Sequence, residues 1–434
     1  MQIKNLLLVC IMTYVCKASD LHISVHAQKT EKTPIGLVYV GALKKSDNIV
    51  LQRLQKDLQY SGQCSVHVKH FNTIKNSLHV KKSFPQNVYV MIFVSKSDDC
   101  YQWRLHDMIS HELLAENQLP IADYSTIGIA HALADQMWPQ LMGSSSSFSS
   151  KIAYCKQIWK NVHGQDKPYK QIWIADFDGT NQKLFVDVPT VSFAPRWSMQ
   201  TNCPLLFYSE NTLSNVQLVM SNMFKKRQVM CCFDGLNMQP TFSSDGQEVV
   251  FCLSKDGSSQ LYHSYVDGLS KKRTCQRLTH NDANNIAPCF IDKNHVAFVS
   301  DYETMRPQLY VMRLSDKSMT RITQGGYCAC PCYSPVTHQI VYSKMIDGAM
   351  QLCTYDCKIK QHMQLTSGSG SKEEPSWSAC GNYIVFGLND GLHSRIAQLH
   401  IATNKIRYIT GVKQHCTYPA YSPVYQKQLG ILKA

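Results

Sequence analysis

A short pattern that recurs six times constrains this chain more than any other feature of its sequence. In each copy a proline is followed two residues later by an aromatic residue, and successive copies lie 45, 48, 43, 44 and 44 residues apart. This spacing is the length of one four-stranded blade of a β-propeller. The repeat therefore predicts six such blades, with anchor prolines at Pro195, Pro240, Pro288, Pro331, Pro375 and Pro419.

Each interval between anchors repeats one internal order. An alternating strand such as 248–251 follows the anchor, a glutamine with two apolar residues comes next, as in 260–262, and a closing strand such as 321–323 ends the interval. All seven Asp-Gly dipeptides lie after residue 150, where tight hairpin turns are needed. Residues 151–155 look like a strand without its anchor, so we expect the last anchor, at 418–422, to pair with them and close the ring.

Residues 20–142 have a different rhythm and predict a small α+β domain. Strands are expected at 21–25, 35–40 and 87–94, and helices over 47–60 and after Asp123. Ser46 is a candidate N-cap of the first helix, and Gly62 follows its end. Gly143 and the serines after it have the composition of a flexible linker. The predicted protein is mainly β: a signal peptide at 1–18, a two-helix α+β domain with a mixed sheet at 19–143, a serine-rich linker at 144–150 and a six-bladed propeller at 151–434.

The N-terminus has the pattern of a cleaved secretory signal. Lys4 precedes an apolar run over 6–15, and Cys16-Lys17-Ala18 offers small residues where a signal peptidase cuts. About ten apolar residues cannot cross roughly 30 Å of hydrocarbon as a helix. A lipid-modified Cys16 is the alternative, although Val15 before it fits that motif poorly. We therefore expect a soluble exported protein without direct membrane insertion.

Sixteen of the 18 cysteines follow the signal, and an oxidising compartment would allow some of them to pair. Cys328, Cys330 and Cys332 alternate, so a regular strand would place all three on one face. A metal or redox site is one interpretation, but no Cys-x-x-Cys pair or histidine at zinc spacing accompanies them, which favours thiols packed in a strand. Residues 176–181 resemble a calcium loop that lacks its twelfth-position glutamate, and a hairpin explains them better. No metal or other cofactor is expected.

The sequence offers little that could serve as an active site. It has no Gly-x-Ser-x-Gly nucleophile elbow, no His-Glu-x-x-His motif and no phosphate or dinucleotide loop. Most of the net charge of +13 lies on residues 144–434, and it is too small for a protein that coats nucleic acid. We therefore expect a binding protein, not an enzyme, with no nucleic-acid partner. A propeller-containing hydrolase and a stand-alone peptide- or glycan-binding propeller are the alternatives.

The loops just before the anchors form the predicted binding surface, because in a propeller they gather at one mouth of the central channel. Their amides, aromatic residue and mixed charge suit recognition of a protein or peptide. Amides both donate and accept, so replacing Asn284 and Asn285 by alanine should weaken binding about tenfold and leave folding nearly intact. The residues predicted to contact a partner are Leu236, Asn237, Gln239, Asn284, Asn285, Ile286 and Tyr327.

The export signal, the small domain and the six anchors together resemble the TolB family of the Tol-Pal envelope system. The motifs that carry the resemblance are residues 21–25, 34–38, 57–62, 151–154 and 176–182. The resemblance implies a monomeric, non-enzymatic periplasmic scaffold that supports outer-membrane integrity and constriction during cell division. It also implies that the mouth binds the peptidoglycan-associated lipoprotein Pal, and that the mature N-terminus, at Leu21, Ile23 and Val25, binds TolA.

Two features depart from the family pattern. Residues 26–33 stand where the family usually has an acidic, glycine-containing continuation of the first strand, and the TolA contact involves that segment. The third anchor, Pro288-Cys289-Phe290, lacks the serine that follows the aromatic residue in the other copies. The cysteine content is also high for a family whose fold does not depend on disulfides.

Overall fold

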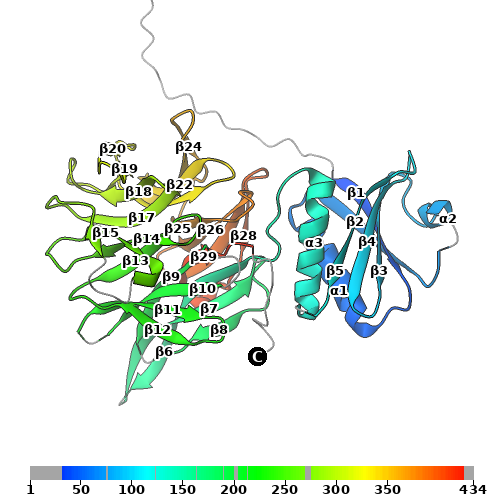
Figure 1. The fold of residues 1–434 in the computed structure, drawn as a ribbon, viewed down its shortest axis with the longest axis horizontal. Helices are drawn as coiled ribbons and strands as arrows, with labels where there is room; N and C mark the ends of the chain where they lie inside the picture. Colours follow the sequence, from blue (N-terminus) through cyan, green and yellow to red (C-terminus); the bar gives the residue numbers. More distant parts are fainter. Residues whose placement is uncertain are drawn as a thin grey trace, which may run out of the picture. The chain divides into compact units, whose positions relative to one another are not determined.

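The computed structural model describes residues 32–74, 77–122, 124–162, 164–188, 190–199, 204–212, 214–268 and 275–424 (Figure 1). The predicted signal peptide and the predicted strand at 21–25 lie outside these residues. None of the helices in the described ranges combines the length and the hydropathy that crossing a bilayer requires.

A five-stranded mixed sheet forms the first part of the described chain. Its strand order is β2-β1-β3-β4-β5, with β1 parallel to both of its neighbours and the β3-β4 and β4-β5 pairs antiparallel. The two predicted helices are α1 and α3, whereas β2, β4, β5 and the short α2 were not predicted. The elements are β1 (Thr33–Val40), α1 (Lys45–Tyr60), β2 (Cys64–Phe71), α2 (Ser77–Lys81), β3 (Val90–Lys96), β4 (Cys100–Asp107), β5 (Leu113–Pro120) and α3 (Thr126–Met142).

The ends of the two long helices follow from local hydrogen bonds. Helix α1 begins after Lys44, whose N–H donates to Asp47 Oδ2 at 3.2 Å, so the prediction that Ser46 is the N-cap was wrong. Ser125 caps α3, with its Oγ accepting from the Gly128 N–H at 3.1 Å. Gly143 ends α3 in the left-handed conformation, with φ of 65°.

The rest of the described chain forms antiparallel sheets like propeller blades, so the fold is mainly β with few helices. Four separate four-stranded sheets lie within residues 237–408, and an eight-stranded sheet has the order β12-β11-β10-β9-β7-β6-β29, with β8 paired to β7. The separate sheets contain β13 (Asn237–Phe242), β14 (Glu248–Leu253), β15 (Gln260–Tyr265) and β16 (Gln276–Arg277); β17 (Asn285–Asp292), β18 (His295–Ser300), β19 (Gln308–Arg313) and β20 (Met319–Arg321); β21 (Cys328–Ser334), β22 (Gln339–Ile346), β23 (Ala349–Asp356) and β24 (Gln361–Gln364); and β25 (Ser371–Trp377), β26 (Tyr383–Asn389), β27 (Ser394–His400) and β28 (Lys405–Tyr408).

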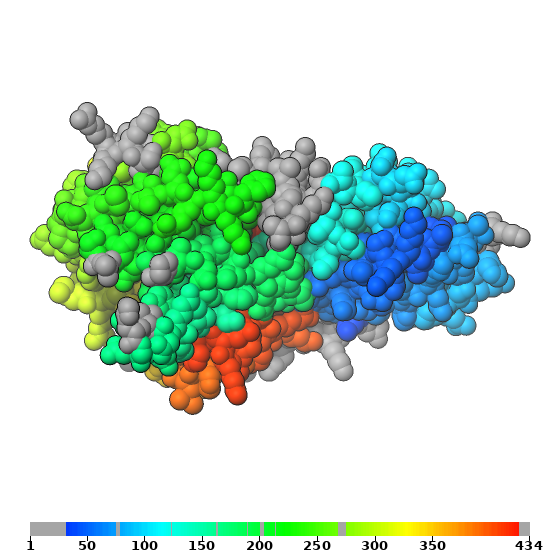
Figure 2. Space-filling model, turned by 90° about the horizontal axis from the view of Figure 1, so that it is seen from below, coloured from blue at the N-terminus to red at the C-terminus, as the bar shows by residue number. Residues whose placement is uncertain are grey.

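The eight-stranded sheet joins the two ends of this part of the chain. Strand β29 pairs antiparallel with β6, as the last anchor predicted. In Figure 2 the red residues near the end of the chain lie against the teal residues of the β6 and β7 region. A single parallel residue pair, Lys170 with Val191, joins β7 to β9. The strands are β6 (Lys151–Val162), β7 (Gln165–Asp176), β8 (Lys183–Val186), β9 (Val191–Trp197), β10 (Leu205–Asn211), β11 (Val216–Asn222), β12 (Arg227–Cys231) and β29 (Cys416–Tyr421).

The second strand of each sheet is almost completely buried, which explains its apolar sequence. Phe251, Phe298 and Phe386 occupy matching positions in β14, β18 and β26, and none of them is exposed. Their clusters combine residues from neighbouring sheets, so each core lies between two sheets. The strands predicted after the anchors are therefore confirmed as core strands.

A β-bulge interrupts the first strand of each sheet at its anchor. The residue before each anchor proline has a positive φ of 50–55°, which is rare for residues with a side chain and rarer still before proline. The bulge at Cys330 breaks the alternation of β21, so Cys328 and Cys332 pack in different apolar clusters. The prediction that three cysteines share one face was therefore wrong. The six residues are Ala194, Gln239, Ala287, Cys330, Glu374 and Tyr418.

The second half of the serine-rich stretch after α3, residues 147–150, is buried, which differs from the flexible linker that its composition predicted. Phe148 is 4% exposed, and Ser150 is not exposed at all. The N–H groups of Phe148 and Ser149 each donate to the Asp135 carboxylate at 2.8 Å. Satisfied backbone groups make burial of this polar segment possible.

Six charged residues, which we call the junction charge cluster, connect the two long helices to β6, β7 and the turn after β7. His131 Nδ1 lies 2.7 Å from Asp57 Oδ2, and its Nε2 lies 3.3 Å from Asp176 Oδ2. Lys151 Nζ lies 2.6 Å from Asp176 Oδ1. Arg53 completes the cluster, with ion pairs to Asp57 at 3.0 Å and to Asp178 at 2.7 Å. These six side chains are largely buried. Two of the carboxylates, those of Asp176 and Asp178, come from residues 176–181 and face cationic side chains.

Candidate functional site

The antiparallel order of each sheet places two sets of turns on the same side. The loop before the first strand and the turn between the second and third strands meet at one end of the sheet. A hydrogen bond connects the two sets in one of the sheets. The carbonyl of Tyr327, in the loop before the first strand, accepts from the N–H of Met345, near the end of the second strand, at 2.8 Å. We call these loops and turns the mouth face, since they surround the ends of the first strands.

Eight exposed large apolar side chains lie on the mouth face, while others lie at the opposite ends and on the outer strands of the same sheets. Met305 is 88% exposed, and Leu392 is 81% exposed. Exposed apolar side chains on neighbouring loops suit contact with another macromolecule. The members in the turns between second and third strands were not predicted from the sequence, although Leu392 directly follows an Asp-Gly turn signal. The exposed apolar residues of the mouth face are Trp159, Leu236, Tyr302, Met305, Tyr327, Met345, Leu392 and Val412.

Repeated glutamines hold the loops of the mouth face in position. Each lies at the start of a third strand, is almost fully buried, and donates its Nε2–H to loop carbonyls. This explains the glutamine before the apolar pair in three of the intervals. The bonds run from Gln260 to Asn281 O (2.8 Å) and Ala283 O (2.9 Å), from Gln308 to Gly326 O (2.7 Å) and from Gln351 to Gly368 O (2.7 Å).

The structure separates the predicted contact residues into an exposed set and a buried set. Leu236 is 38% exposed, Tyr327 is 44% exposed, and Asn284 is exposed at the end of its loop. Asn237 and Gln239 lie within β13, and Asn285 and Ile286 lie within β17, so their placement in loops was wrong. Gln239 and Ile286 are half-buried.

Asn237 and Asn285 have no exposed surface, and their side chains bond to their own loops. Asn237 Nδ2 donates to the carbonyls of Val216 at 2.7 Å and Phe233 at 2.6 Å. Asn285 Nδ2 donates to Asn281 Oδ1 at 2.7 Å. Removing either amide would leave buried groups unpaired, so the structure leads us to expect that Asn285→Ala destabilises the fold, contrary to the expectation from the sequence.

Side chains beside the anchor prolines connect neighbouring first strands around the channel. Gln239 Oε1 accepts from the Ala287 N–H at 2.9 Å, and Thr241 Oγ1 accepts from the Phe290 N–H at 3.2 Å. Cys289 Sγ accepts from the Tyr333 N–H at 3.1 Å, which gives one of the unexpected cysteines a structural role. The bulges therefore make hydrogen bonds between sheets available that a regular first strand would lack.

Ionisation of Glu374, the residue before the anchor Pro375, should change the free energy of unfolding. Its carboxylate accepts a hydrogen bond from the Tyr418 N–H, and burial raises its pKa to about 7. Because the folded pKa lies above the unfolded value, stability should fall as pH rises from about 4.5 through 7.

We expect Glu374→Gln to remove this loss, because glutamine can accept the same bond without a charge. The variant should be more stable than the parent by about 1–2 kcal/mol at pH 8, after allowing for water around a half-buried group, and equal to it near pH 4.5. Urea unfolding at the two pH values measures the difference. A constant difference at both pH values would contradict the assignment.

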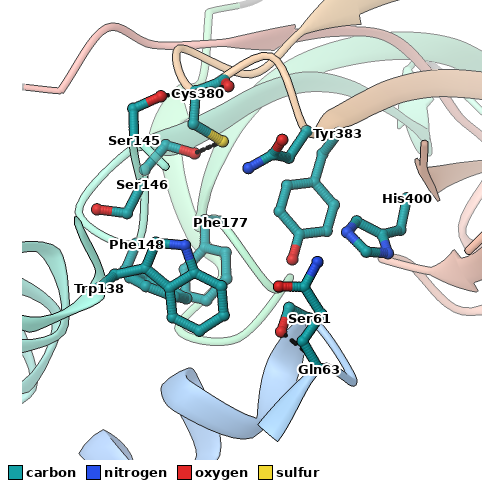
Figure 3. A pocket seen from close by; sticks show the side chains of 12 residues that line it. Ser61, Gln63, Trp138, Ser145, Ser146, Phe148, Phe177, Cys380, Tyr383 and His400 are labelled. Carbon is teal, nitrogen blue, oxygen red and sulfur yellow. Dashed lines mark hydrogen bonds between the residues drawn. The ribbon is translucent and has the colours of Figure 1, made fainter. Parts of the chain in front are cut away.

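A small cavity lies where the serine-rich stretch meets the last blade-like sheet. In Figure 3 Trp138 and Phe177 lie across from Tyr383 and His400, with Cys380 at the far end. Burial is the main cause that lowers the pKa of His400 to about 4, so this imidazole is neutral at pH 7. The cavity volume is only about 10 Å³, which is room for one water. The cavity is therefore part of the packing between elements and not a substrate site.

The described residues contain no group of three or more His, Cys, Asp or Glu side chains that could hold a metal ion. The 15 cysteines within the described ranges are all free thiols, and eight of them are buried. Burial raises the pKa of several of these thiols, for example Cys252 and Cys416 to about 12. Such thiols are inert packing groups at neutral pH.

The described residues form a small α+β unit and propeller-like sheets whose mouth face carries exposed apolar side chains. The PD40 family, described as the TolB beta propeller domain, matches residues 138–425, and the chain belongs to this family. It is 24% identical over 372 residues to "Tol-Pal system protein TolB" of Francisella tularensis subsp. mediasiatica, which covers 79% of this chain and 81% of that protein.

A second relative and a solved structure agree with this assignment. The chain is 23% identical over 284 residues to the protein of the same name from Ruthia magnifica, and the match spans 64% of this chain and 65% of the relative's length. The crystal structure of TolB from Acinetobacter baumannii superposes with a TM-score of 0.73 at 20% identity, and covers 91% of this chain and 97% of that one. This second likeness shows a shared fold.

Proposed function

We propose that this protein is a periplasmic, non-enzymatic component of a Tol-Pal system that binds a Pal-like lipoprotein through the mouth face. The observation that carries the proposal is the set of exposed apolar side chains on loops that buried glutamines and asparagines hold in place. The names of the relatives, "Tol-Pal system protein TolB", support the assignment. Rigid loops with exposed aromatic and apolar residues bind proteins at low entropic cost.

The proposal includes six blades and a second partner. Six blades result if β29-β6-β7-β8 and β9-β10-β11-β12 count as two blades, since one residue pair joins them. The mature N-terminus, with Leu21, Ile23 and Val25, is the proposed binding segment for TolA. In this scheme Leu236, Asn284, Ile286, Gln239 and Tyr327 contact the lipoprotein, while Asn237 and Asn285 shape the loops that carry them.

The test removes exposed side chains of the mouth face. The double variant Asn284→Ala/Tyr327→Ala should bind the periplasmic domain of the organism's Pal-like lipoprotein at least tenfold more weakly in calorimetry, because interface aromatics contribute about 1–2 kcal/mol or more each. Its melting temperature should stay within about 2 °C of the parent, since both residues are exposed.

The matched control changes the same residue types at the opposite ends of the strands. Tyr265 is 60% exposed and Asn294 is exposed in the turn between β17 and β18, so Tyr265→Ala/Asn294→Ala should bind like the parent. Equal weakening in both double variants would contradict a site on the mouth face. Hydrolysis of peptides or glycans by the purified protein would instead favour an enzyme, and a failure to bind any lipoprotein would favour a stand-alone binding propeller.

A further inference from the structure

The β6–β7 hairpin projects beyond its own sheet. Both strands have 12 residues, whereas the second and third strands of the other sheets have six to eight. Strand β29 covers β6 only as far as Lys156, and β8 covers β7 only over Ile172–Ile174. Six residue pairs therefore extend past the sheet, a length of about 20 Å.

This extension, which we call the hairpin arm (residues 156–162 and 164–170), projects on the mouth face. Lys156 pairs with Cys416, the first residue of β29, and the Gln157 N–H donates to the His415 carbonyl at 3.0 Å. The arm thus continues past the N-terminal end of an innermost strand. That end is where the loops before the anchors lie.

The arm has one open backbone edge. Because residues alternate along a strand, the N–H and C=O groups of Trp159 and Asn161 point to the same side as those of Gln157. Among the described residues no backbone group pairs with them beyond the Gln157 bond to His415. Four backbone groups on this edge are therefore available to another strand.

The two faces of the arm differ in chemistry. Lys156, Ile158 and Lys160 share one face of β6, with Lys167 opposite Lys160 on β7. Trp159, which is 62% exposed, lies on the other face opposite Pro168. An added strand would thus meet lysines on one side and an aromatic residue on the other.

The described residues neutralise the positive charge of the arm only in part. Residues 156–170 contain four lysines and one aspartate. Lys160 pairs with Asp187 at 2.9 Å, whereas Lys156 and Lys167 have no described carboxylate within ion-pair distance. Lys160 and Lys167 face each other directly, and like charges in that position destabilise a hairpin that little else supports. A local cost of this kind indicates that the charges serve an interaction.

We propose that the hairpin arm binds an acidic, extended segment of a partner protein, which adds to β6 as an antiparallel strand. Carboxylates at alternate positions of that segment face Lys156 and Lys160, and apolar side chains between them cover Trp159. Backbone bonds to Trp159 and Asn161 supply the affinity, and the lysines select the charge of the segment. This inference does not depend on which protein occupies the mouth.

The test measures binding of a labelled nine-residue peptide of alternating Glu and Val to the full chain by fluorescence anisotropy. We expect binding that weakens at least fivefold between 50 and 500 mM NaCl, and at least tenfold weaker binding of the Lys-Val peptide. N-methylation of alternate amides in the Glu-Val peptide should abolish binding, because the charges remain while the edge bonds cannot form. Equal binding of both charge types, or undiminished binding of the methylated peptide, would overturn the proposal.

Variants of the chain locate the site. Lys156→Glu/Lys167→Glu should weaken peptide binding at least tenfold, and Trp159→Ser about fivefold. The control Lys358→Glu/Lys405→Glu makes the same charge change at exposed positions on the opposite ends of the strands and should alter binding less than twofold. An unchanged affinity in the hairpin variants would refute the assignment, as would recovery of the chain on anionic vesicles with the same dependence on Lys156 and Lys167. Because Asn284→Ala/Tyr327→Ala should leave peptide binding intact, this proposal and the proposed function can fail separately.

Discussion

Replacing Asp176 by alanine should lower the free energy of unfolding by about 3–5 kcal/mol. Its carboxylate is 1% exposed and contacts both Lys151 and His131, so alanine would leave two buried cationic groups without their shared partner. Burial alone would raise the pKa of Asp176, but the hydrogen bond from His131 and the charge of Lys151 outweigh burial and hold the pKa well below its usual range. The contribution is therefore present at neutral pH and is lost only in strong acid.

The measurement is guanidinium unfolding of the full chain followed by tryptophan fluorescence. An exposed ion pair in the same protein provides the control: Arg104 and Glu116 lie 3.1 Å apart with side chains 63% and 57% exposed. Glu116→Ala should cost less than about 1 kcal/mol. If Asp176→Ala and Glu116→Ala destabilised the protein equally, the junction charge cluster would not stabilise the fold as its burial indicates.

His131 should respond to pH in the opposite direction from Asp176. Burial alone would lower its pKa, but the carboxylates of Asp57 and Asp176 outweigh burial and raise it. A histidine with a raised folded pKa stabilises the fold fully below about pH 6.5, and this contribution is lost as pH rises through the folded pKa. The cluster therefore connects the helices to β6 and β7 most strongly in mildly acidic conditions.

The repeated elements of this fold could be predicted because they depend on local pattern. The anchors, the core strands after them and the closing of the ring at β29 follow from alternation and period alone. Strand β2 was missed because its sequence, CSVHVKHF, mixes histidine and lysine with apolar residues on an edge strand. The composition of the serine-rich stretch wrongly predicted a flexible linker. Its backbone N–H groups donate hydrogen bonds to the carboxylate of Asp135 in α3, which composition cannot show.

The candidate site was predictable only in part. The loops of the mouth face could be located from the sequence. The sequence could not show that the side-chain amides of Asn237 and Asn285 already donate hydrogen bonds within the protein. A bulge in each first strand determines which residue beside the proline faces the first strand of the next sheet. The alternation of apolar and polar residues in the sequence does not reveal where a bulge lies. The junction charge cluster could not be predicted from the sequence either, because His131 contacts the carboxylates of Asp57 and Asp176, which lie 74 and 45 residues away in the chain.

Phe177 should be the most sensitive apolar residue where α1 and α3 meet the propeller-like sheets. Its ring is 2% exposed and lies 4.8 Å from the Tyr60 ring, 5.2 Å from the Phe148 ring and 5.6 Å from the His131 ring, measured between centroids. We expect Phe177→Ala to lower the free energy of unfolding by about 3–5 kcal/mol, because the cavity would open among several elements at once. Phe177→Leu, which keeps most of the volume, should cost clearly less.

The same variant should expose the connection between the two parts of the chain. Tyr60 belongs to α1, His131 to α3 and Phe148 to the serine-rich stretch, so loss of the Phe177 ring loosens all three contacts. Limited trypsin digestion of Phe177→Ala should cut near Lys151 at least tenfold faster than in the parent, because local opening exposes a buried backbone. Phe224→Ala is the matched control, since that phenylalanine is 81% exposed. Equal cleavage rates in the two variants, or an unchanged unfolding midpoint for Phe177→Ala, would show that the ring does not hold the two parts together.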